Sequence, residues 1–267
     1  MVCLYWIMYK KSINFYLSFY FFLQKEYLYL KIKNMENTFQ NNVLLIDSTD
    51  QVRVEFYKKT YAHVAGGVLV FVLFEYLLLQ SSMIVDFMMS MTQGWRWLIM
   101  LGGFMLVTNY AESTILKTSD KNTQYLAYAL YIFAQALIFV PLLYIAIYYT
   151  EGAELVQQAA VVTLALFAGI SAVVFVTKKD FSFLKAGLTV GFFIAMGLIV
   201  AGSLFGFDLG LWFSVGMCIL AAGSILYQTS NLVNKYGTED YIPASLGLFA
   251  SLMLLFWYVL SFFMSRD

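Results

Sequence analysis

The strongest constraint in this sequence is a series of seven apolar stretches, each about as long as the 20 residues that a helix needs to cross a bilayer. The chain is 61% hydrophobic and 12% charged, whereas a soluble domain is about 45–50% apolar and about 25% charged. We therefore predict an all-α, polytopic integral membrane protein with seven transmembrane helices. Their approximate bounds are 61–80, 95–112, 125–149, 156–177, 184–205, 211–233 and 242–263.

Lysine and arginine residues near the ends of these stretches predict the orientation, because cytoplasmic loops are enriched in both. Nine basic residues fall on one side if the chain alternates across the bilayer, whereas Arg96 and Arg266 fall on the other. We therefore expect a cytoplasmic N-terminus and a C-terminus on the opposite side. The nine are Arg53, Lys58, Lys59, Lys117, Lys121, Lys178, Lys179, Lys185 and Lys235.

The N-terminal region divides at Met35. The apolar run 15–23 is too short to span a bilayer, and no small-residue cleavage site follows it. We expect residues 1–34 to be translated upstream sequence and Met35 to be the start, although an amphipathic surface helix is the alternative. The expected domains are a cytoplasmic tail over 1–53 and a membrane domain over 54–267.

Composition argues against several functional classes. The formal net charge is zero, so a nucleic-acid partner has no electrostatic support. Two cysteines and one histidine provide neither a disulfide framework nor a metal-ligand pattern. No nucleophile–base arrangement and no phosphate-binding glycine loop is visible. We therefore expect a protein that is not an enzyme, has no cofactor and has the lipid bilayer as its main surroundings.

Two polar residues interrupt the last two apolar stretches. Gln228 and Ser251 should face the bundle interior, because hydrocarbon offers no hydrogen-bond partner to an amide or a hydroxyl. One interpretation is a fixed hydrogen bond between the two helices. The other is a permanently neutral constriction in a pore.

Three further polar side chains are candidate site residues. Glu75 should lie about 7.5 Å inside the outer end of the first span, at the level of Arg96. It could form a structural ion pair with Arg96, provide a site that admits cations or carries protons, or reach the interface without a specific partner. His63 should lie at the cytoplasmic mouth of the first span, where it could sense pH or simply pack. Glu112 is expected in a solvated loop.

Several stretches of the sequence resemble the Bax inhibitor-1/YccA family of membrane proteins, in its bacterial form. They are VEFYKKTYAHVAGGVLVF (54–71), ALIFVPLLY (136–144), FVTKKDFSFL (175–184), ILYQTSNLV (225–233) and LFASLMLLFWYVL (248–260). The resemblance implies a seven-helix fold and, in some members, a pH-sensitive calcium leak gated by two aspartates. Other members bind a membrane protease or act in cell-death pathways.

The positions that match the two gate aspartates are Gln228 and Ser251. The resemblance therefore predicts a calcium leak channel with altered or absent proton gating, and calcium ions as a partner. The alternative is a non-transporting regulator that binds a membrane protease or another membrane protein. A bacterial inner membrane is the expected location, with a eukaryotic endomembrane as the alternative.

Overall fold

The computed structural model describes residues 44–92, 95–150, 152–205 and 210–266. The stretch 1–34 lies outside these residues, and so does the prediction about its origin. The described chain contains a short 3-10 helix, η2 (Leu45–Asp47), followed by eight α-helices. They are α2 (Asp50–Leu79), α3 (Ser82–Met91), α4 (Trp95–Lys117), α5 (Lys121–Tyr148), α6 (Ala153–Thr177), α7 (Leu184–Phe205), α8 (Gly210–Asn234) and α9 (Tyr241–Arg266).

Seven of the eight α-helices coincide with the predicted spans. Among the described residues, α2, α5, α6, α8 and α9 are long and apolar enough to cross a membrane. The other two predicted spans correspond to α4 and α7, which are continuous helices of 23 and 22 residues. The all-helical fold is confirmed, and the crossing of the membrane by all seven helices stays a prediction.

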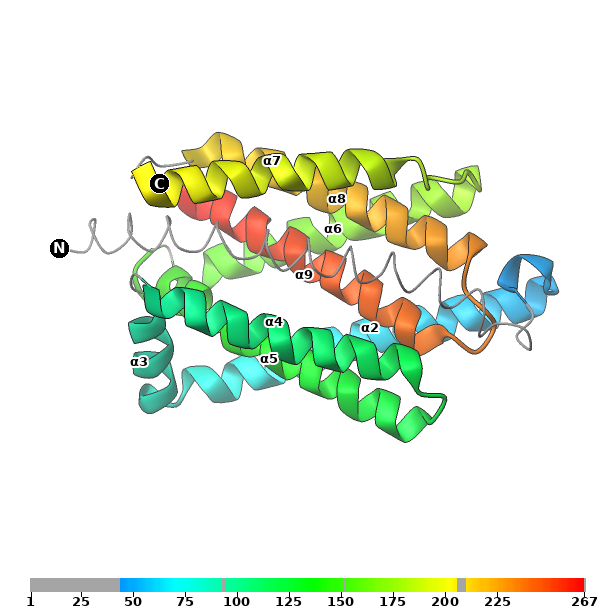
Figure 1. Cartoon of the computed structure of the whole chain (residues 1–267), viewed down its shortest axis with the longest axis horizontal. Helices are drawn as coiled ribbons and strands as arrows, with labels where there is room; N and C mark the ends of the chain where they lie inside the picture. Colours follow the sequence, from blue (N-terminus) through cyan, green and yellow to red (C-terminus); the bar gives the residue numbers. More distant parts are fainter. Residues whose placement is uncertain (1–43, 93–94, 151, 206–209, 267) are drawn as a thin grey trace.

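Helix α9 is the centre of the bundle. It packs against α2, α4, α5, α6 and α8, and in Figure 1 it runs through the middle of the other helices. It is the most thoroughly buried of the five apolar helices. Aromatic rings fill the space around it: the ring centroids of Phe139 and Trp257 are 4.7 Å apart, and those of Phe71 and Phe139 are 5.2 Å apart. These contacts join α2, α5 and α9 in one core.

The four basic regions of the sequence lie at one end of the bundle. The start of α2 and the α4–α5, α6–α7 and α8–α9 loops share the right-hand end in Figure 1, whereas α3 lies at the opposite end. Successive predicted spans therefore alternate in direction in a way that agrees with the distribution of basic residues along the sequence. Which side of a membrane the basic end faces stays a prediction.

Helix α2 begins at Asp50, well before the predicted span, because its first turns are already packed. Phe56 and Thr60 are buried, and Glu55 and Lys59 form an ion pair of 2.7 Å along the helix. The residues before α2 also contact the bundle. Leu45 is fully buried, and its backbone N–H donates to the carbonyl of Tyr236 in the α8–α9 loop at 3.0 Å.

The α6–α7 loop is fastened to α8 through Asp180. The Ser182 backbone N–H and the Ser230 hydroxyl donate to the Asp180 carboxylate at 2.8 and 3.2 Å. Ser182, the main contributor, and Ser230 hold the pKa of Asp180 below its ordinary value. A carboxylate with a lowered pKa stabilises the fold above its unfolded-state pKa, and this contribution disappears as the pH falls through the folded-state pKa.

We therefore expect Asp180→Asn to lower the melting temperature at pH 7 by about 1–3 °C, the size expected for one partly exposed hydrogen-bonded group. At pH 3 the two proteins should melt nearly together. Thermal melts of detergent-purified protein measure both differences. Asp86→Asn, on the exposed face of α3, is the control. An equal loss at both pH values would contradict a role for the charged carboxylate.

Candidate functional site

Ser251 and its neighbours form a neutral contact between α8 and α9. The Ser251 side chain is 1% exposed. Its hydroxyl lies 3.1 Å from the Ser224 hydroxyl on α8 and 2.9 Å from the Gly247 carbonyl on its own helix. The prediction that Ser251 faces the interior is confirmed. Sequence reasoning missed Ser224, although it lies one turn before Gln228 on the same face of α8.

Gln228 lies one helical turn away from this contact and meets a different residue of α9. A Cβ atom at Gly247 would be 3.0 Å from the Gln228 Oε1 atom. Because α8 and α9 are antiparallel, Ser224 faces Ser251 and Gln228 faces Gly247. The predicted hydrogen bond between Gln228 and Ser251 is therefore wrong, and the bond between these helices joins Ser251 to Ser224.

Glu112 is buried beside Gln228. It is 2% exposed and lines a small cavity with Gln228, Tyr236 and Gly247. Burial, chiefly, raises the pKa of Tyr236 above its ordinary value, and the nearby Glu112 carboxyl contributes. The prediction of a solvated loop at Glu112 is wrong, because α4 continues past it to Lys117.

A pattern in the sequence could have revealed this placement. Thr108, Ala111, Glu112 and Ile115 have the spacing of one helical face, and all four are buried. Hydropathy alone ends the span at Glu112 because the following residues are polar. The helical period continues beyond that point and places the carboxyl in the bundle.

Glu75 is buried within α2 without the predicted cationic partner. Its side chain is 5% exposed, and neither carboxylate oxygen has a hydrogen-bond partner among the described residues. Arg96 is exposed on α4. The ion pair between them is therefore absent, although both residues lie toward the same end of the bundle. Glu75 shares the inward stripe of α2 with Phe71 and Leu78.

His63 lies on α2 and bridges to α5. Its Nδ1 atom is 2.6 Å from the Lys59 carbonyl, and its Nε2 atom is 2.8 Å from the Tyr125 hydroxyl. A carbonyl can only accept, so Nδ1 donates to Lys59, and a second hydrogen bond joins Nε2 to the Tyr125 hydroxyl. This arrangement suits the packing interpretation of His63, and pH sensing stays a prediction.

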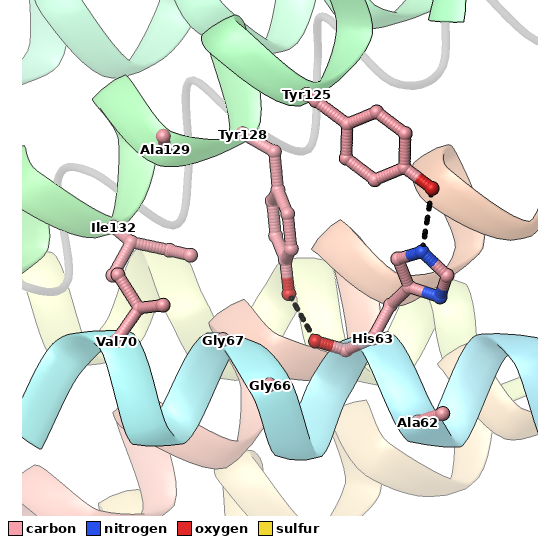
Figure 2. A pocket seen from close by; sticks show the side chains of 9 residues that line it. All are labelled: Ala62, His63, Gly66, Gly67, Val70, Tyr125, Tyr128, Ala129 and Ile132. Carbon is pink, nitrogen blue, oxygen red and sulfur yellow. Dashed lines mark hydrogen bonds between the residues drawn. The ribbon is translucent and has the colours of Figure 1, made fainter.

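A groove of about 330 Å³ runs along the outside of the bundle between α2 and α5. Figure 2 shows His63 and Tyr125 at one end, and Val70 and Ile132 at the other. Between them the Tyr128 hydroxyl donates to the His63 carbonyl at 3.2 Å. The groove is therefore polar at the end that lies toward the basic loops, and apolar farther along.

A second group that the sequence did not reveal consists of three hydroxyls where α2, α6 and α8 meet. The Tyr61 hydroxyl faces those of Ser171 and Thr229. All three oxygen atoms are buried and lie near one another, although none meets the geometry of a full hydrogen bond with a described residue. Phe167 and Phe175 flank Tyr61, with ring centroids at 6.0 and 5.9 Å. Three hydroxyl oxygens are therefore concentrated at one point of the interior.

Similar proteins come from bacteria and animals. Modulator of FtsH protease YccA of Escherichia coli is 33% identical over 117 residues, which is 43% of this chain and 53% of that protein. An uncharacterised Pseudomonas aeruginosa protein is 35% identical over 114 residues, or 42% of this chain and 51% of that protein. Protein lifeguard 4 of Mus musculus is 33% identical over 112 residues, or 40% and 46%. The matched stretches thus span about half the length of these relatives.

The match to a protein family is more extensive than any of these pairwise matches. Residues 53–267 match the family described as inhibitor of apoptosis-promoting Bax1. This range includes the whole of α3 to α9 and nearly all of α2. The chain is therefore a membrane protein that belongs to the Bax inhibitor family.

Proposed function

We propose that this protein regulates another membrane protein by binding it, and that the partner is a membrane protease of the FtsH kind. The observation that carries the proposal is the neutral contact at Ser251. A pair of close carboxyls can titrate near neutral pH and act as a switch, whereas the side chains of Gln228 and Ser251 cannot. Ser251 is also fixed between Ser224 and Gly247. Binding a partner requires no proton switch.

The family relationship supports the same proposal. The relative YccA carries the name modulator of FtsH protease. The stretch of YccA that matches this chain is about half the length of YccA. Relatives from Pseudomonas, Neisseria and Escherichia support a bacterial inner membrane as the location. The basic end of the bundle supports a cytoplasmic N-terminus.

A reconstituted protease assay tests the proposal. The full chain and a bacterial FtsH protease are placed together in lipid nanodiscs, and the degradation of a membrane substrate is followed. We expect the two proteins to co-purify and the degradation rate to change at least about two-fold, with saturation near equimolar amounts. An unrelated polytopic membrane protein is the control. Absence of both co-purification and a rate change would contradict the proposal.

Reporter fusions test the proposed orientation. Fusions after Lys121 and after Lys179 should report the cytoplasm, and a fusion after Asp267 should report the opposite side. The physical reason is the nine-to-two distribution of basic residues. A reporter at Asp267 that reads as cytoplasmic would contradict seven spans, because Asp267 and the start of α2 would then lie on the same side of the membrane.

A cation leak is the second candidate function, and the buried polar groups favour it. Glu75 and Glu112 are buried carboxyls, and the Tyr61, Ser171 and Thr229 hydroxyls offer further oxygen atoms. Oxygen atoms are the ligands that calcium prefers. Calcium flux into liposomes that contain the purified protein tests this function directly.

If the protein conducts calcium, we expect the flux to vary little between about pH 6 and pH 8, because Gln228 and Ser251 do not titrate. His63→Ala, Glu75→Gln and Glu112→Gln should remove most of any remaining dependence, since Glu75 and Glu112 are buried carboxyls and His63 is the one imidazole of the sequence. A steep pH profile that persists in the triple variant would contradict this expectation.

A further inference from the structure

The two walls of the groove between α2 and α5 carry the same order of side chains. On α2, Lys59 lies one turn before His63, and Gly66 lies about one turn after it. On α5, Lys121 lies one turn before Tyr125. Each wall therefore presents, from the basic end inward, an ammonium group, a polar ring and then an apolar surface.

The two ammonium groups converge at the polar end of the groove. The Nζ atom of Lys121 is 4.5 Å from the ring centroid of Tyr241, and that of Lys59 is 5.9 Å from the same centroid. The His63 ring lies 5.0 Å from this ring as well. Tyr241, the first residue of α9, thus brings cationic groups from α2 and α5 to one point.

Both lysines can interact with an added anion. Lys121 donates to the backbone carbonyl of Glu239 at 2.7 Å, and its charge interacts with the nearby Asp240 carboxylate without a direct ion pair between these two described side chains. Lys59 pairs with Glu55 at 2.7 Å, but both side chains are largely exposed, and such surface pairs contribute little. An anion at this point can therefore compete for both ammonium groups.

We propose that the groove binds one anionic phospholipid from the surrounding bilayer. Its phosphate lies at Lys59 and Lys121, and an acyl chain follows the apolar surface past Gly66 toward Val70 and Ile132. The order of charge, polar interface and hydrocarbon along both walls is the order of groups along a phospholipid. Basic residues attract anionic lipids at a membrane surface. The acyl chain is already surrounded by hydrocarbon, so its contribution is van der Waals packing against the groove wall.

The length of the groove favours a lipid chain over a partner helix. From His63 to Val70 the wall extends about 10 Å, at 1.5 Å per residue. A transmembrane helix requires a contact surface several turns longer to pack stably. The lipid site is also independent of the proposed regulatory role, because its residues lie on α2, α5 and α9 and not at the Ser224–Ser251 contact.

Gly66 offers a direct way to close the groove. A Cβ atom built at Gly66 has no neighbouring atom within 4 Å, so a larger side chain can extend into the groove without displacing the backbone. Gly169 on α6 also has no neighbour within 4 Å and is exposed. Gly66→Leu therefore fills the groove, and Gly169→Leu is the matched control on another outward-facing surface.

The test is native mass spectrometry of the full chain in detergent with added phosphatidylglycerol or phosphatidylcholine of equal chain length. We expect the wild type to retain one phosphatidylglycerol at least about tenfold better than phosphatidylcholine. The double variant Lys59→Gln with Lys121→Gln should lose this preference, and Gly66→Leu should lose retention of both lipids. Gly169→Leu and the double variant Lys59→Arg with Lys121→Arg should behave like the wild type.

Other outcomes would overturn the proposal. Equal retention of the two lipids by the wild type would exclude recognition of the anionic headgroup. Undiminished retention by Gly66→Leu would place the lipid elsewhere. Binding of glycerol phosphate as tight as that of phosphatidylglycerol would show an anion site that does not use the groove. A dimer that Gly66→Leu abolishes would identify a second copy of the chain as the occupant. Thermal melts confirm that each variant is folded.

Discussion

Glu75→Met is expected to raise the melting temperature of the purified protein by about 3–10 °C. The carboxyl is buried and its two oxygens have no hydrogen-bond partner among the described residues. A buried polar group in this condition costs about 1–3 kcal/mol, and 1 kcal/mol corresponds to about 2–4 °C in a chain of this size. Methionine keeps the length of the side chain and removes the polar group. Thermal melts in detergent at pH 7 measure the change.

The control for this substitution is Glu154→Met at the exposed start of α6, where we expect a change of at most about 0.5 kcal/mol. A lower melting temperature for Glu75→Met would show that the carboxyl has a stabilising partner in the membrane. A more stable protein that no longer affects its proposed protease partner would instead identify Glu75 as a functional group maintained at a cost in stability.

Gly67→Ala is expected to lower the melting temperature by about 3–8 °C. A Cβ atom at this position would be 2.5 Å from the Tyr128 hydroxyl oxygen and 3.3 Å from the Phe249 ring. Tyr128 is buried, and its hydroxyl donates to the His63 carbonyl. The ring would have to move and lose this bond, and such overpacking costs about 1–3 kcal/mol.

The neighbouring glycine provides a matched control, because Gly66 faces the open groove. Gly66→Ala should leave the melting temperature unchanged or raise it slightly, since alanine favours a helix over glycine by about 1 kcal/mol. Adding Tyr128→Phe to Gly67→Ala should recover part of the loss, because it removes the closest atom. Equal losses at Gly66 and Gly67 would mean that α2 and α5 are not in close contact at Tyr128.

The positions of the helices along the sequence were predictable, whereas several of their ends were not. Hydropathy detects the part of a helix that is apolar on all sides, and it therefore placed all seven long helices. It does not detect amphipathic extensions such as the first turns of α2, where Phe56 and Thr60 are buried but their neighbours are polar. These ends depend on packing against other helices.

The sequence predicted which helices carry the candidate residues, but not which neighbouring helix each side chain faces. Counting residues correctly placed Glu75 inside the first helix, and the rarity of polar groups in apolar stretches correctly directed Ser251 inward. The pairing of Glu75 with Arg96 assumed that residues at one level face each other. The rotation of each helix about its axis decides this, and it is set by contacts such as that of Gly247 with Gln228, which the sequence alone does not specify.

The central position of α9 has a consequence for the order in which the bundle can assemble. Ribosomes make this helix after all the other described helices, yet α2, α4, α5, α6 and α8 pack against it. Until α9 enters the membrane, the earlier helices have only each other and lipid along the surfaces that it later covers. The helices made before α9 therefore remain incompletely packed until α9 leaves the insertion machinery, and only then can the contacts around it form.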